Sequence, residues 1–333
     1  MRAMVLSEYG KKLELKEVPT PSPERGQVQV KVKAAGLCGS DLKIMDGKFD
    51  FIKLPHIPGH EITGEITAIG EGVSPDMLGK RIIAHTHHTC GVCKFCATQE
   101  YNMCTKLRGR LGFEMPGGLG EFLVMDAINT VPIPDNIKYT DACVIPCAMI
   151  TTYHGINRAQ VKSGDRVVLL GVGGLGFHAI AFLLNIGANV TAVDVKQEKL
   201  AIAKELGAHT MLSYDDFAAN SELYDVIMDS VANVDITAFC QKKLAKRGRY
   251  LMVGYMPGAA FTFDSFYMHA NETSIIGLRN GTLPELREIV DLVSQGKAKP
   301  IIDKVMSLED ANEVLDMIRS GSVMGRIVLT HND

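Results

Sequence analysis

The sequence predicts an α/β protein made of two parts, and two patterns support this fold class. The first 135 residues form short apolar segments of period-two character, interrupted by glycine and proline, which is typical of a β-rich body. After Thr140, buried strands alternate with longer helical segments. Such alternation predicts a parallel sheet with right-handed crossovers. A length of 333 residues fits about two domains.

The elements follow from these periods. In the first part, strands are expected over Val28–Ala34, Glu61–Ile69 and Glu121–Met125. The second part opens with a buried strand over Val167–Leu170, a helix over Leu175–Ile186, a strand over Asn189–Asp194, and an amphipathic helix over Gln197–Leu206 that ends at Gly207. The rhythm continues through Tyr224–Met228, Asp235–Leu244 and Arg249–Val253, and the chain closes with helices over Pro284–Ser294 and Leu308–Ser320 and a strand over Arg326–Thr330.

The composition argues against two classes of partner. Lys plus Arg number 35 and Asp plus Glu number 38, so the formal net charge is −3. The chain therefore lacks the basic character of proteins that bind nucleic acids or anionic membranes. The uncharged run between Arg166 and Asp194 contains several glycines, so it fits a strand, a turn and a buried helix better than a membrane span. The amino-terminal segment has no long apolar core, so no secretory signal and a cytoplasmic location are expected.

A glycine motif between a strand and a helix points to a dinucleotide. It consists of Gly171, Gly173, Gly174, Leu175 and Gly176. In a G-x-G-x-x-G motif, the first glycine permits a tight turn and the second lets backbone N–H groups approach a pyrophosphate. The third glycine lets the helix pack closely on the strand. Glycines that serve only packing are the alternative, but the acidic residue at the end of the next strand favours the nucleotide.

That acidic residue, Asp194, also bears on the choice of cofactor. It lies 18 residues after Gly176, where a carboxylate can accept hydrogen bonds from the adenosine ribose hydroxyls. The same carboxylate would repel a 2′-phosphate, so the sequence favours NAD over NADP. Lys196 and Lys199 lie nearby and leave NADP open, and Lys199 is expected to contact the cofactor.

Four cysteines lie close together in a lobe of residues 88–106. They are Cys90, Cys93, Cys96 and Cys104. Zinc takes four such thiolates tetrahedrally, and a site of this kind is structural because no position stays open for substrate. An iron–sulfur cluster or free thiols are the alternatives, whereas disulfides need an oxidising compartment. The upstream residues His85, His87 and His88 are alternative ligands, although a polar approach to the lobe is the favoured interpretation.

A second set of metal-binding residue types is dispersed along the chain. Cys38 lies in the segment Gly36–Asp41, His60 lies between Gly59 and Glu61, and Cys147 follows Pro146. Each residue alone is unremarkable, since a lone cysteine is usually a small buried apolar group. Together they supply two thiolates and one imidazole, the ligand count of a catalytic zinc that keeps its fourth position for substrate.

These motifs resemble, in order, those of the zinc-dependent medium-chain dehydrogenase/reductase superfamily, alcohol dehydrogenase type. The matching segments are Gly36–Asp41, Gly59–Glu61, the four-cysteine lobe, Pro146–Tyr153, Gly171–Gly176, Asp194 and Gly325–Leu329. The resemblance implies a GroES-like β-rich catalytic domain over residues 1–148 and 280–333, with a Rossmann NAD-binding domain over residues 149–279 inserted in it. It also implies an active site in the cleft between them, two zinc ions per chain and NAD as cofactors.

The resemblance assigns roles to the dispersed set. Cys38, His60 and Cys147 would hold the catalytic zinc, which lowers the pKa of a bound alcohol. Ser40 would accept the alcohol proton and pass it to the nicotinamide ribose. Two acidic residues, Asp41 and Glu61, would orient His60 and tune the metal, and in relatives the glutamate can enter the coordination sphere. Cys143 is the rival third ligand, but the segment that starts at Cys147 matches the family pattern.

The chain departs from the family pattern at two positions. Lys43 stands where the proton relay often ends in a histidine, and its unperturbed pKa of about 10.4 makes it a poor proton acceptor near neutrality unless desolvated. Three roles compete: a relay lysine, a bystander to direct proton exit to water, which is favoured, or a cationic contact to cofactor or substrate. Gly39 stands where some relatives carry an arginine on the pyrophosphate, and Arg326 is expected to supply that charge.

The expected activity is reversible hydride transfer between NAD and a primary or secondary alcohol, aromatic or hydroxylated alcohols included. A polyol or β-hydroxy-amino-acid dehydrogenase is the alternative, although the thiolate of Cys147 favours simple alcohols because polyol dehydrogenases commonly place a glutamate there. A non-catalytic zinc- and NAD-binding module is the alternative from another class. Pocket walls are expected from Gly47–His56, Leu111–Gly118 and Ala270–Asn280. The expected partners are a small alcohol or carbonyl substrate and further copies of the chain, as a tetramer or else a dimer.

Overall fold

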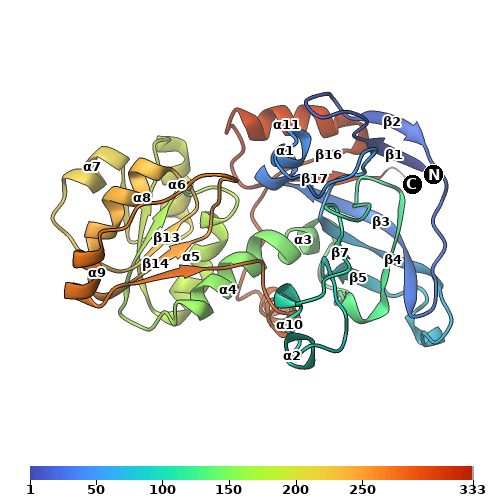
Figure 1. Cartoon of the computed structure of the whole chain (residues 1–333), viewed down its shortest axis with the longest axis horizontal. Coiled ribbons are helices and arrows are strands. Elements are labelled where there is room, and N and C mark those ends of the chain that lie inside the picture. Colours follow the sequence, from blue (N-terminus) through green and yellow to red (C-terminus); the bar gives the residue numbers. More distant parts are fainter. Residues whose placement is uncertain (332–333) are drawn as a thin grey trace. The chain divides into compact units, whose positions relative to one another are not determined.

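The computed structural model describes residues 1–331 and divides the chain into two compact units (Figure 1). Unit 1 comprises Met1–Ile150, Asn280–Gly296 and Pro300–Asp333, and unit 2 comprises Thr151–Arg279 and Lys297–Lys299. Residues 332 and 333, which are expected in the catalytic domain, lie outside the described residues. Unit 1 is therefore built from separate stretches of sequence, and each unit has its own hydrophobic core.

The main sheet of unit 1 has seven strands among the described residues, in the order β16-β17-β3-β4-β5-β9, with β8 also paired to β3. Their bounds are β3 Gln27–Leu37, β4 Glu61–Ile69, β5 Arg81–Ala84, β8 Phe122–Asp126, β9 Thr130–Pro132, β16 Ile302–Ser307 and β17 Arg326–Thr330. Neighbours are antiparallel except β16 and β17, which are parallel. Strand β17, from the end of the chain, thus pairs with β3 near its beginning (Figure 1).

Smaller elements complete unit 1. Strand β1 (Arg2–Val5) pairs with β2 (Glu14–Glu17), and β6 (His87–His88) pairs with β7 (Gly109–Arg110). The helices are α1 Gly39–Met45, α2 Lys94–Ala97, α3 Tyr139–Cys143, α10 Leu283–Ser294 and α11 Ala311–Arg319. Short 3-10 turns are η1 Pro75–Met77, η2 Tyr101–Met103, η3 Ala127–Asn129 and η6 Leu308–Asp310, and η4 (Ile145–Met149) is a turn of π-helix.

The core of unit 1 forms because alternate residues of β3 are apolar. Val28, Val30 and Val32 are fully buried, while the lysines and glutamines between them are half-buried. Burial of each such side chain stabilises the fold by about 1.5 to 3 kcal/mol relative to exposure. Helix α11 adds Val314 and Leu315 to the same cluster. Leu37 of β3 and Ile62 of β4, which neighbour Cys38 and Glu61 in sequence, belong to the same cluster.

Unit 2 contains a six-stranded sheet in the order β12-β11-β10-β13-β14-β15, in which every neighbouring pair is parallel. The strands are β10 Arg166–Leu170, β11 Asn189–Val193, β12 Thr210–Leu212, β13 Tyr224–Asp229, β14 Leu244–Met252 and β15 Ser274–Gly277. The helices are α4 Ile150–Arg158, α5 Gly176–Ile186, α6 Gln197–Glu205, α7 Tyr214–Ala219, α8 Val234–Cys240 and α9 Ser265–Asn271, with a 3-10 turn η5 at Gln241–Lys243.

The strand order of unit 2 contains a topological switch point. The chain runs outward from β10 through β11 to β12, then returns to the other side of β10 and runs outward again from β13 to β15. The switch point therefore lies between β10 and β13, and open α/β sheets bind nucleotides at the carboxyl ends of the strands there. Four of the five residues of β10 and of β11 are buried, as expected of strands covered on both faces. The predicted α/β fold class is confirmed.

Two predicted boundaries were wrong. The helix expected over Asp235–Leu244 ends at Cys240 and continues as the 3-10 turn η5, and Leu244 is the first residue of β14. The apolar Leu244 fits either period, and its pairing with Tyr224 of β13 assigns it to the sheet. The helix expected over Leu308–Ser320 begins with a 3-10 turn, and the α-helical part starts at Ala311.

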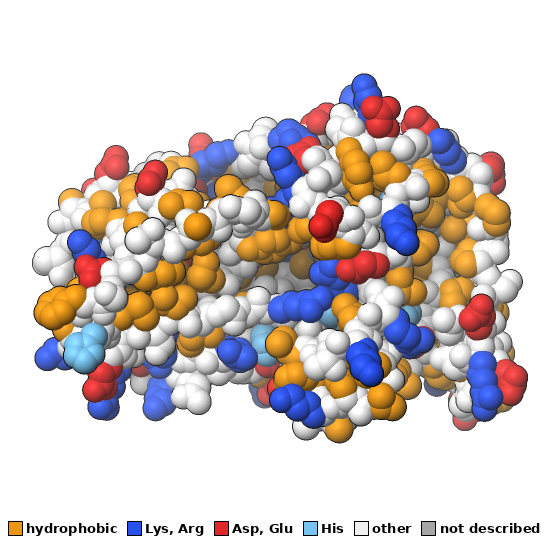
Figure 2. Space-filling model, viewed as in Figure 1, with side chains coloured by type: hydrophobic (Ala, Val, Ile, Leu, Met, Phe, Trp, Pro, Cys, Tyr) orange, Lys and Arg blue, Asp and Glu red, His pale blue; other side chains and the backbone are white. Residues whose placement is uncertain are grey.

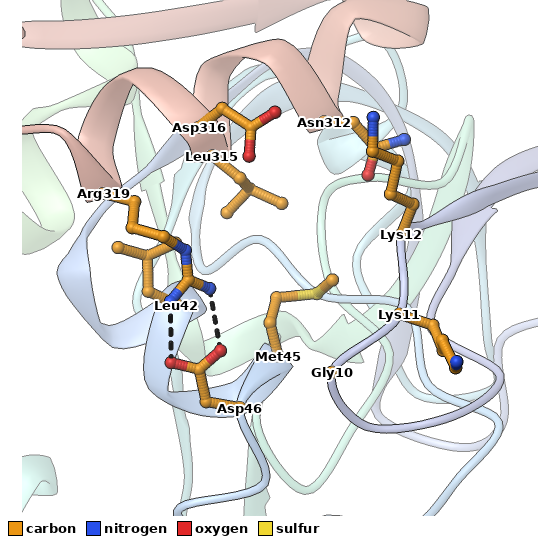
Figure 3. A pocket seen from close by; sticks show the side chains of 10 residues that line it. All are labelled: Gly10, Lys11, Lys12, Leu42, Met45, Asp46, Asn312, Leu315, Asp316 and Arg319. Atoms are coloured by element: carbon orange, nitrogen blue, oxygen red, sulfur yellow. Dashed lines mark hydrogen bonds and ion pairs between the residues drawn. The ribbon is translucent and has the colours of Figure 1, made fainter.

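Helices α1 and α11 line a pocket of about 370 Å³ on unit 1 (Figure 3). Met45 of α1 and Leu315 of α11 line its apolar part, and Lys11 and Lys12 come from the segment before β2. Arg319 donates to both carboxylate oxygens of Asp46, at 2.7 and 3.1 Å. This pair links the two helices at the surface and thereby helps to hold α1, which carries several of the predicted site residues.

The described surface carries charges of both signs, as the nearly balanced composition with its net charge of −3 predicts (Figure 2). Figure 2 shows cationic and acidic side chains interspersed on the face that it draws. Among the described residues, no helix combines the length and the apolar character that crossing a lipid bilayer requires.

Candidate functional site

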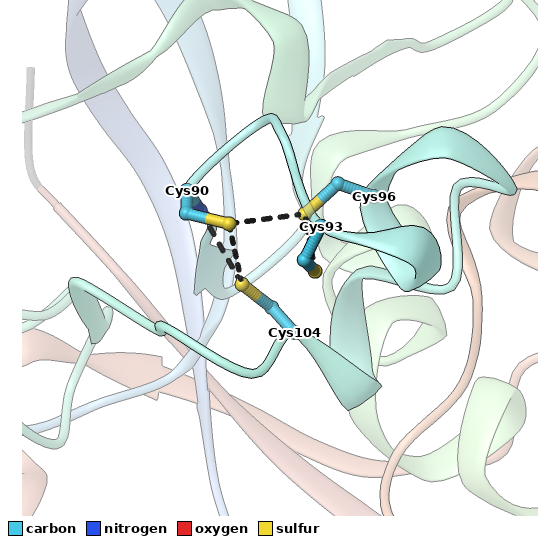
Figure 4. A group of neighbouring side chains, drawn as sticks. All are labelled: Cys90, Cys93, Cys96 and Cys104. Carbon is cyan, nitrogen blue, oxygen red and sulfur yellow. Dashed lines mark hydrogen bonds between the residues drawn. The ribbon is translucent and has the colours of Figure 1, made fainter.

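The four-cysteine lobe brings its thiols together (Figure 4). The Sγ atoms of Cys90 and Cys96 lie 3.8 Å apart, those of Cys93 and Cys96 3.4 Å, and those of Cys90 and Cys104 3.6 Å. A tetrahedral zinc with Zn–S bonds of about 2.3 Å requires S···S distances of about 3.8 Å. None of these cysteines forms a disulfide. The lobe therefore fits a closed zinc site made of four thiolates.

Local structure explains how the lobe forms. Cys93 is the N-cap of the short helix α2, which carries Cys96, and Cys104 follows the 3-10 turn η2. The backbone N–H of Cys90 donates to Sγ of Cys104 over 3.3 Å. Hydrogen bonds from the backbone N–H groups of Thr105 and Cys96 lower the pKa of Cys93 to about 5. Donors of this kind favour the thiolate, which is the form that binds metal.

The dispersed residues also come together. Ligand atoms of Cys38, His60, Glu61 and Cys147 lie within 4.8 Å of one another. Sγ of Cys38 and Nε2 of His60 are 3.4 Å apart, close to the separation of about 3.6 Å expected for two ligands of one tetrahedral zinc. The sheet brings them together: Cys38 follows β3 and is the N-cap of α1, His60 immediately precedes β4, and Glu61 is the first residue of β4. Cys147 lies in the π-turn η4.

Asp41 holds backbone groups and the imidazole of this cluster in place. Its carboxylate is fully buried and accepts the backbone N–H groups of Cys38 at 2.8 Å and Gly59 at 3.2 Å. It also lies 3.3 Å from Nδ1 of His60. Because a carboxylate accepts, Nδ1 carries the proton and Nε2 keeps its lone pair toward Cys38. Burial lowers the pKa of His60, but Asp41 and the Cys38 thiolate outweigh it and raise that pKa, so a zinc ion at Nε2 would displace a proton that the same two groups attract.

Glu61 and Arg326 form a buried ion pair at the cluster. Glu61 is fully buried, and burial raises its pKa to about 7. Nε of Arg326 lies 3.4 Å from Oε1 of Glu61, and Arg326 Nη2 lies 3.9 Å from Sγ of Cys147. Neither carboxylate oxygen of Glu61 has a hydrogen bond. The chemistry of this donor set, two thiolates, an imidazole and an unsatisfied carboxylate, fits a zinc ion with one exchangeable position.

The sequence did not reveal the pairing of Arg326 with Glu61. It follows from sheet register, because Glu61 lies opposite Gly36 on β3, and Gly36 in turn lies opposite Val328 on β17. A Cβ at Gly36 would stand 2.4 Å from Oε2 of Glu61, so only glycine leaves room for this carboxylate. The glycine before Cys38 is the signal that could have indicated a close approach. A contact of Arg326 with a pyrophosphate stays a prediction.

Three further predicted residues lie near the cluster. The thiol of Cys143 donates to the backbone carbonyl of Glu61 at 3.2 Å, and burial raises its pKa well above the usual value, so it is not in the ligand group. Ser40 is half-buried, and its backbone N–H donates to Sγ of Cys38 at 3.3 Å. Burial lowers the pKa of Lys43 in the same helix, and the Cys38 thiolate opposes that shift.

The glycine loop of unit 2 has the geometry that the motif predicts. Gly171 has a φ of +81°, which favours glycine, and a Cβ at Gly176 would stand 2.6 Å from the carbonyl oxygen of Gly171. A Cβ at Gly173 would meet Nζ of Lys199 at 3.6 Å and nothing else within 4 Å. The face of Gly173 is therefore open to a phosphate, with a lysine ammonium beside it. Gly174 and Leu175 complete the turn, and Leu175 is the N-cap of α5.

Asp194 lies beside this loop. It is half-buried at the end of β11, and its carboxylate accepts the backbone N–H of Val172 at 3.0 Å through Oδ2 and that of Lys196 at 3.0 Å through Oδ1. The carboxylate is thus fixed at the carboxyl edge of the sheet next to the glycine loop. This is the position at which the sequence pattern expects a partner for ribose hydroxyls.

The three upstream histidines are buried and lie outside both ligand groups. His85 hydrogen-bonds through Nε2 to the backbone oxygen of Gly281 at 3.1 Å, and its Nδ1 has no hydrogen-bond partner. Nδ1 of His88 lies 3.4 Å from the carboxylate of Asp126, which also pairs with Arg108. The rings of His85 and His87 are 5.3 Å apart. The favoured interpretation of a polar segment leading to the lobe agrees with this arrangement.

Comparison with known proteins places the chain in a family. Residues 24–135 match the alcohol dehydrogenase GroES-like domain, and residues 174–295 match the zinc-binding dehydrogenase domain. An alcohol dehydrogenase of Geobacillus stearothermophilus is 35% identical over 99% of this chain and 98% of its own. A NAD-dependent alcohol dehydrogenase of Sulfurisphaera tokodaii is 31% identical over 99% of both chains. The structure of acetophenone reductase from Geotrichum candidum in complex with NAD superposes with a TM-score of 0.91 at 32% identity, covering 99% of this chain and 96% of that one.

The chain therefore belongs to the zinc-dependent medium-chain dehydrogenase/reductase family, alcohol dehydrogenase type. It is an oxidoreductase with a GroES-like part and a Rossmann-like part. The resemblance stated from the motifs is confirmed.

We predict that two single substitutions will each remove one zinc ion from a different site. Wild-type protein should carry two zinc ions per chain. Cys147→Ser should retain the lobe zinc only, and Cys104→Ser should retain the other zinc only, because each loses one thiolate ligand. Elemental analysis of the purified variants measures this. Cys143→Ser is the matched control, since its thiol only donates to a backbone carbonyl. Two zinc ions in Cys147→Ser, or one in Cys143→Ser, would contradict the ligand assignment.

We also predict a pH-dependent loss of stability that depends on His85. Burial lowers the pKa of this histidine to about 4, against about 6.5 in the unfolded chain. As pH falls from 6.5 toward 4, the unfolded state takes up a proton that the folded state does not, so the free energy of unfolding decreases. Denaturant titrations at pH 6.5 and pH 4.5 should show wild type losing about 2 kcal/mol more than His85→Gln. Equal losses of unfolding free energy in wild type and His85→Gln would contradict the lowered pKa of His85.

Proposed function

We propose that the protein is a NAD-dependent zinc alcohol dehydrogenase that interconverts a primary or secondary alcohol with its aldehyde or ketone. The observation that carries the proposal is the cluster of Cys38, His60, Glu61 and Cys147, in which ligand atoms lie within 4.8 Å of one another. A closed four-thiolate site and a glycine loop in the same chain support it. When bound, zinc supplies a Lewis acid for the alcohol oxygen and NAD supplies the hydride acceptor.

The residues of the cluster would hold the metal and set its charge. Cys38, His60 and Cys147 are the proposed ligands of the catalytic zinc. Two thiolates cancel the double positive charge of zinc, so the centre can bind an anionic oxygen without a large excess of charge. Asp41 keeps Nε2 of His60 directed toward the metal position, and a support of this kind raises metal affinity. Glu61 is proposed as a nearby carboxylate that tunes the centre.

Ser40 is the proposed proton acceptor. It lies two residues after the ligand Cys38 on α1, and its backbone N–H is fixed by the hydrogen bond to Sγ of that cysteine. A hydroxyl accepts one proton while donating its own, so it can pass a proton onward without becoming charged. Burial lowers the pKa of Lys43, which increases the fraction of the uncharged amine. A relay role for Lys43 is therefore retained as the alternative to direct proton exit to water.

The nucleotide would bind through the glycine loop of unit 2. Its residues are Gly171, Gly173, Gly174, Leu175 and Gly176. We propose that Lys199 contacts the pyrophosphate, because its Nζ lies beside the open face of Gly173. Asp194 would accept the adenosine ribose hydroxyls and exclude a 2′-phosphate, which favours NAD. The NAD complex of the related acetophenone reductase supports this choice.

Aromatic side chains suggest an apolar substrate. The ring centroids of Phe113 and His60 are 5.0 Å apart. The ring centroid of Phe49 lies 6.2 Å from that of Phe113 and 5.1 Å from that of Phe51. The guanidinium of Arg110 stacks on Phe113 at 4.4 Å and pairs with Glu114. These rings would favour alcohols with an apolar or aromatic substituent over polyols.

Unit 1 is proposed as the catalytic domain and unit 2 as the NAD-binding domain. A homotetramer and a cytoplasmic location stay predictions.

The test is a substrate panel with the purified zinc-loaded chain, followed through NADH absorbance. We expect 1-phenylethanol, 2-butanol or a primary alcohol to be oxidised with a kcat/KM at least about tenfold above that of sorbitol or threonine. A higher kcat/KM for sorbitol or threonine would move the proposal to the alternative class. Absence of turnover with every alcohol would contradict the proposed activity.

The cofactor preference is tested in the same assay. Asp194→Gly should lower the ratio of kcat/KM for NAD over NADP by about tenfold or more, because it removes both an attraction to the ribose and a repulsion of the 2′-phosphate. Glu198→Gln, an exposed carboxylate in α6, is the matched control and should leave the ratio unchanged. An unchanged ratio in Asp194→Gly would contradict its role.

A further inference from the structure

A buried carboxylate in unit 2 has no part in the site as described. Asp229 is the last residue of β13 and is 1% exposed. Among the described residues, no cation forms a salt bridge with it. Buried charges are normally paired with an opposite charge, and an unpaired one requires several hydrogen bonds instead. Asp229 satisfies both oxygens in this second way.

Each oxygen of Asp229 has a different set of partners. Oδ2 accepts the hydroxyl of Thr237 in α8 at 2.9 Å and that of Tyr250 in β14 at 2.8 Å. Both hydroxyl residues are fully buried. Oδ1 accepts the backbone N–H groups of Val231 at 2.8 Å and Ala232 at 3.0 Å. The carboxylate therefore connects the packed interior, through Oδ2, to the turn 230–232, through Oδ1.

The turn is held in a backbone conformation that it would not adopt by itself. Ala232 has a φ of +56°, which is unfavourable for a residue with a Cβ. The backbone carbonyl of Asp229 accepts the N–H groups of Val253 at 2.9 Å and Gly254 at 2.8 Å, which fixes the start of the turn against β14. The two bonds to Oδ1 hold the rest of it.

The turn 230–232 lies at the switch point of the sheet, beside the glycine loop. The N–H of Ser230 donates to the carbonyl of Leu170, the last residue of β10, at 3.0 Å. A Cβ at Gly171 would stand 2.9 Å from Cγ2 of Val231. Val231 is nevertheless 45% exposed, so an apolar side chain is presented to solvent at the edge where nucleotides bind in such sheets. Exposed apolar groups at such an edge suit the flat face of a ribose or a base.

We propose that Asp229 is a positioning residue for the dinucleotide: through Oδ1 it holds the turn 230–232 so that Val231 forms an apolar wall of the nucleotide site next to Gly171. This inference rests on the proposed use of NAD. It assigns to a residue that touches no cofactor atom the task of fixing one that does. The observation behind it is that the buried carboxylate accepts hydrogen bonds from the turn through Oδ1 and from two buried hydroxyls through Oδ2.

The test compares NADH binding in three proteins with intact zinc sites. NADH fluorescence titration gives the dissociation constant without turnover, and the chain contains no tryptophan to interfere. Asp229→Ala should weaken NADH binding tenfold or more, while the KM for alcohol at saturating NAD changes less than twofold. Asp225→Ala is the matched control on the same strand, because Asp225 pairs with Arg166 at the opposite end of β13. It should lower thermal stability and leave the dissociation constant unchanged.

The outcomes separate the inference from the function on which it rests. Wild type that fails to bind NADH would overturn the proposed cofactor and the inference with it. Wild type and Asp229→Ala with equal dissociation constants would overturn the inference alone. If Asp229→Ala does not fold, Val231→Ser decides the question, because Val231 is 45% exposed and the change removes the proposed apolar wall without disturbing the core. It should weaken NADH binding threefold or more, and unchanged binding would overturn the proposal.

Discussion

The dispersed metal cluster depends on the contacts that the buried carboxylate of Asp41 makes. This carboxylate binds the backbone of Cys38, the backbone of Gly59 and the ring of His60 at once. The end of β3, the start of α1 and the approach to β4 are thereby held together around one side chain. Because a buried carboxylate without these donors would be costly, the three segments are coupled, and two of the three proposed zinc ligands acquire fixed positions from this coupling.

The two metal clusters differ in how their ligands are gathered, and this explains what the sequence could reveal. The lobe cysteines lie within a short segment, so their spacing alone predicts a site and local turns bring the thiols together. Cys38, His60 and Cys147 depend on the β3–β4 pairing and on the π-turn η4, and their assignment needed the family resemblance. The glycine loop and Asp194 were also predictable, because a strand, a tight turn and a helix form one local unit.

Features that depend on register or on a single hydrogen bond could not be predicted in this way. The pair of Arg326 and Glu61 exists because β17 and β4 flank β3, which no local pattern encodes. The support of Val231 by Asp229 depends on how β13 ends relative to α8 and β14. The boundary between α8 and β14 was misplaced because Leu244 suits the apolar face of a helix and of a strand equally. The α/β class and the order of elements survive such errors, since they follow from long periodic segments.

The most direct test of the central claim is the zinc affinity of Asp41→Asn, measured by competition with a chromophoric chelator. The amide keeps the size of the side chain but has one acceptor oxygen in place of two, so it cannot hold both backbone groups and the imidazole. Loss of a supporting group of this kind weakens metal binding by about 10- to 100-fold. The account predicts such a loss for one zinc per chain, with the lobe zinc unaffected and with Asp76→Asn, a change at an exposed carboxylate in η1, behaving as wild type. Equal affinity for both zinc ions in Asp41→Asn and wild type would contradict it.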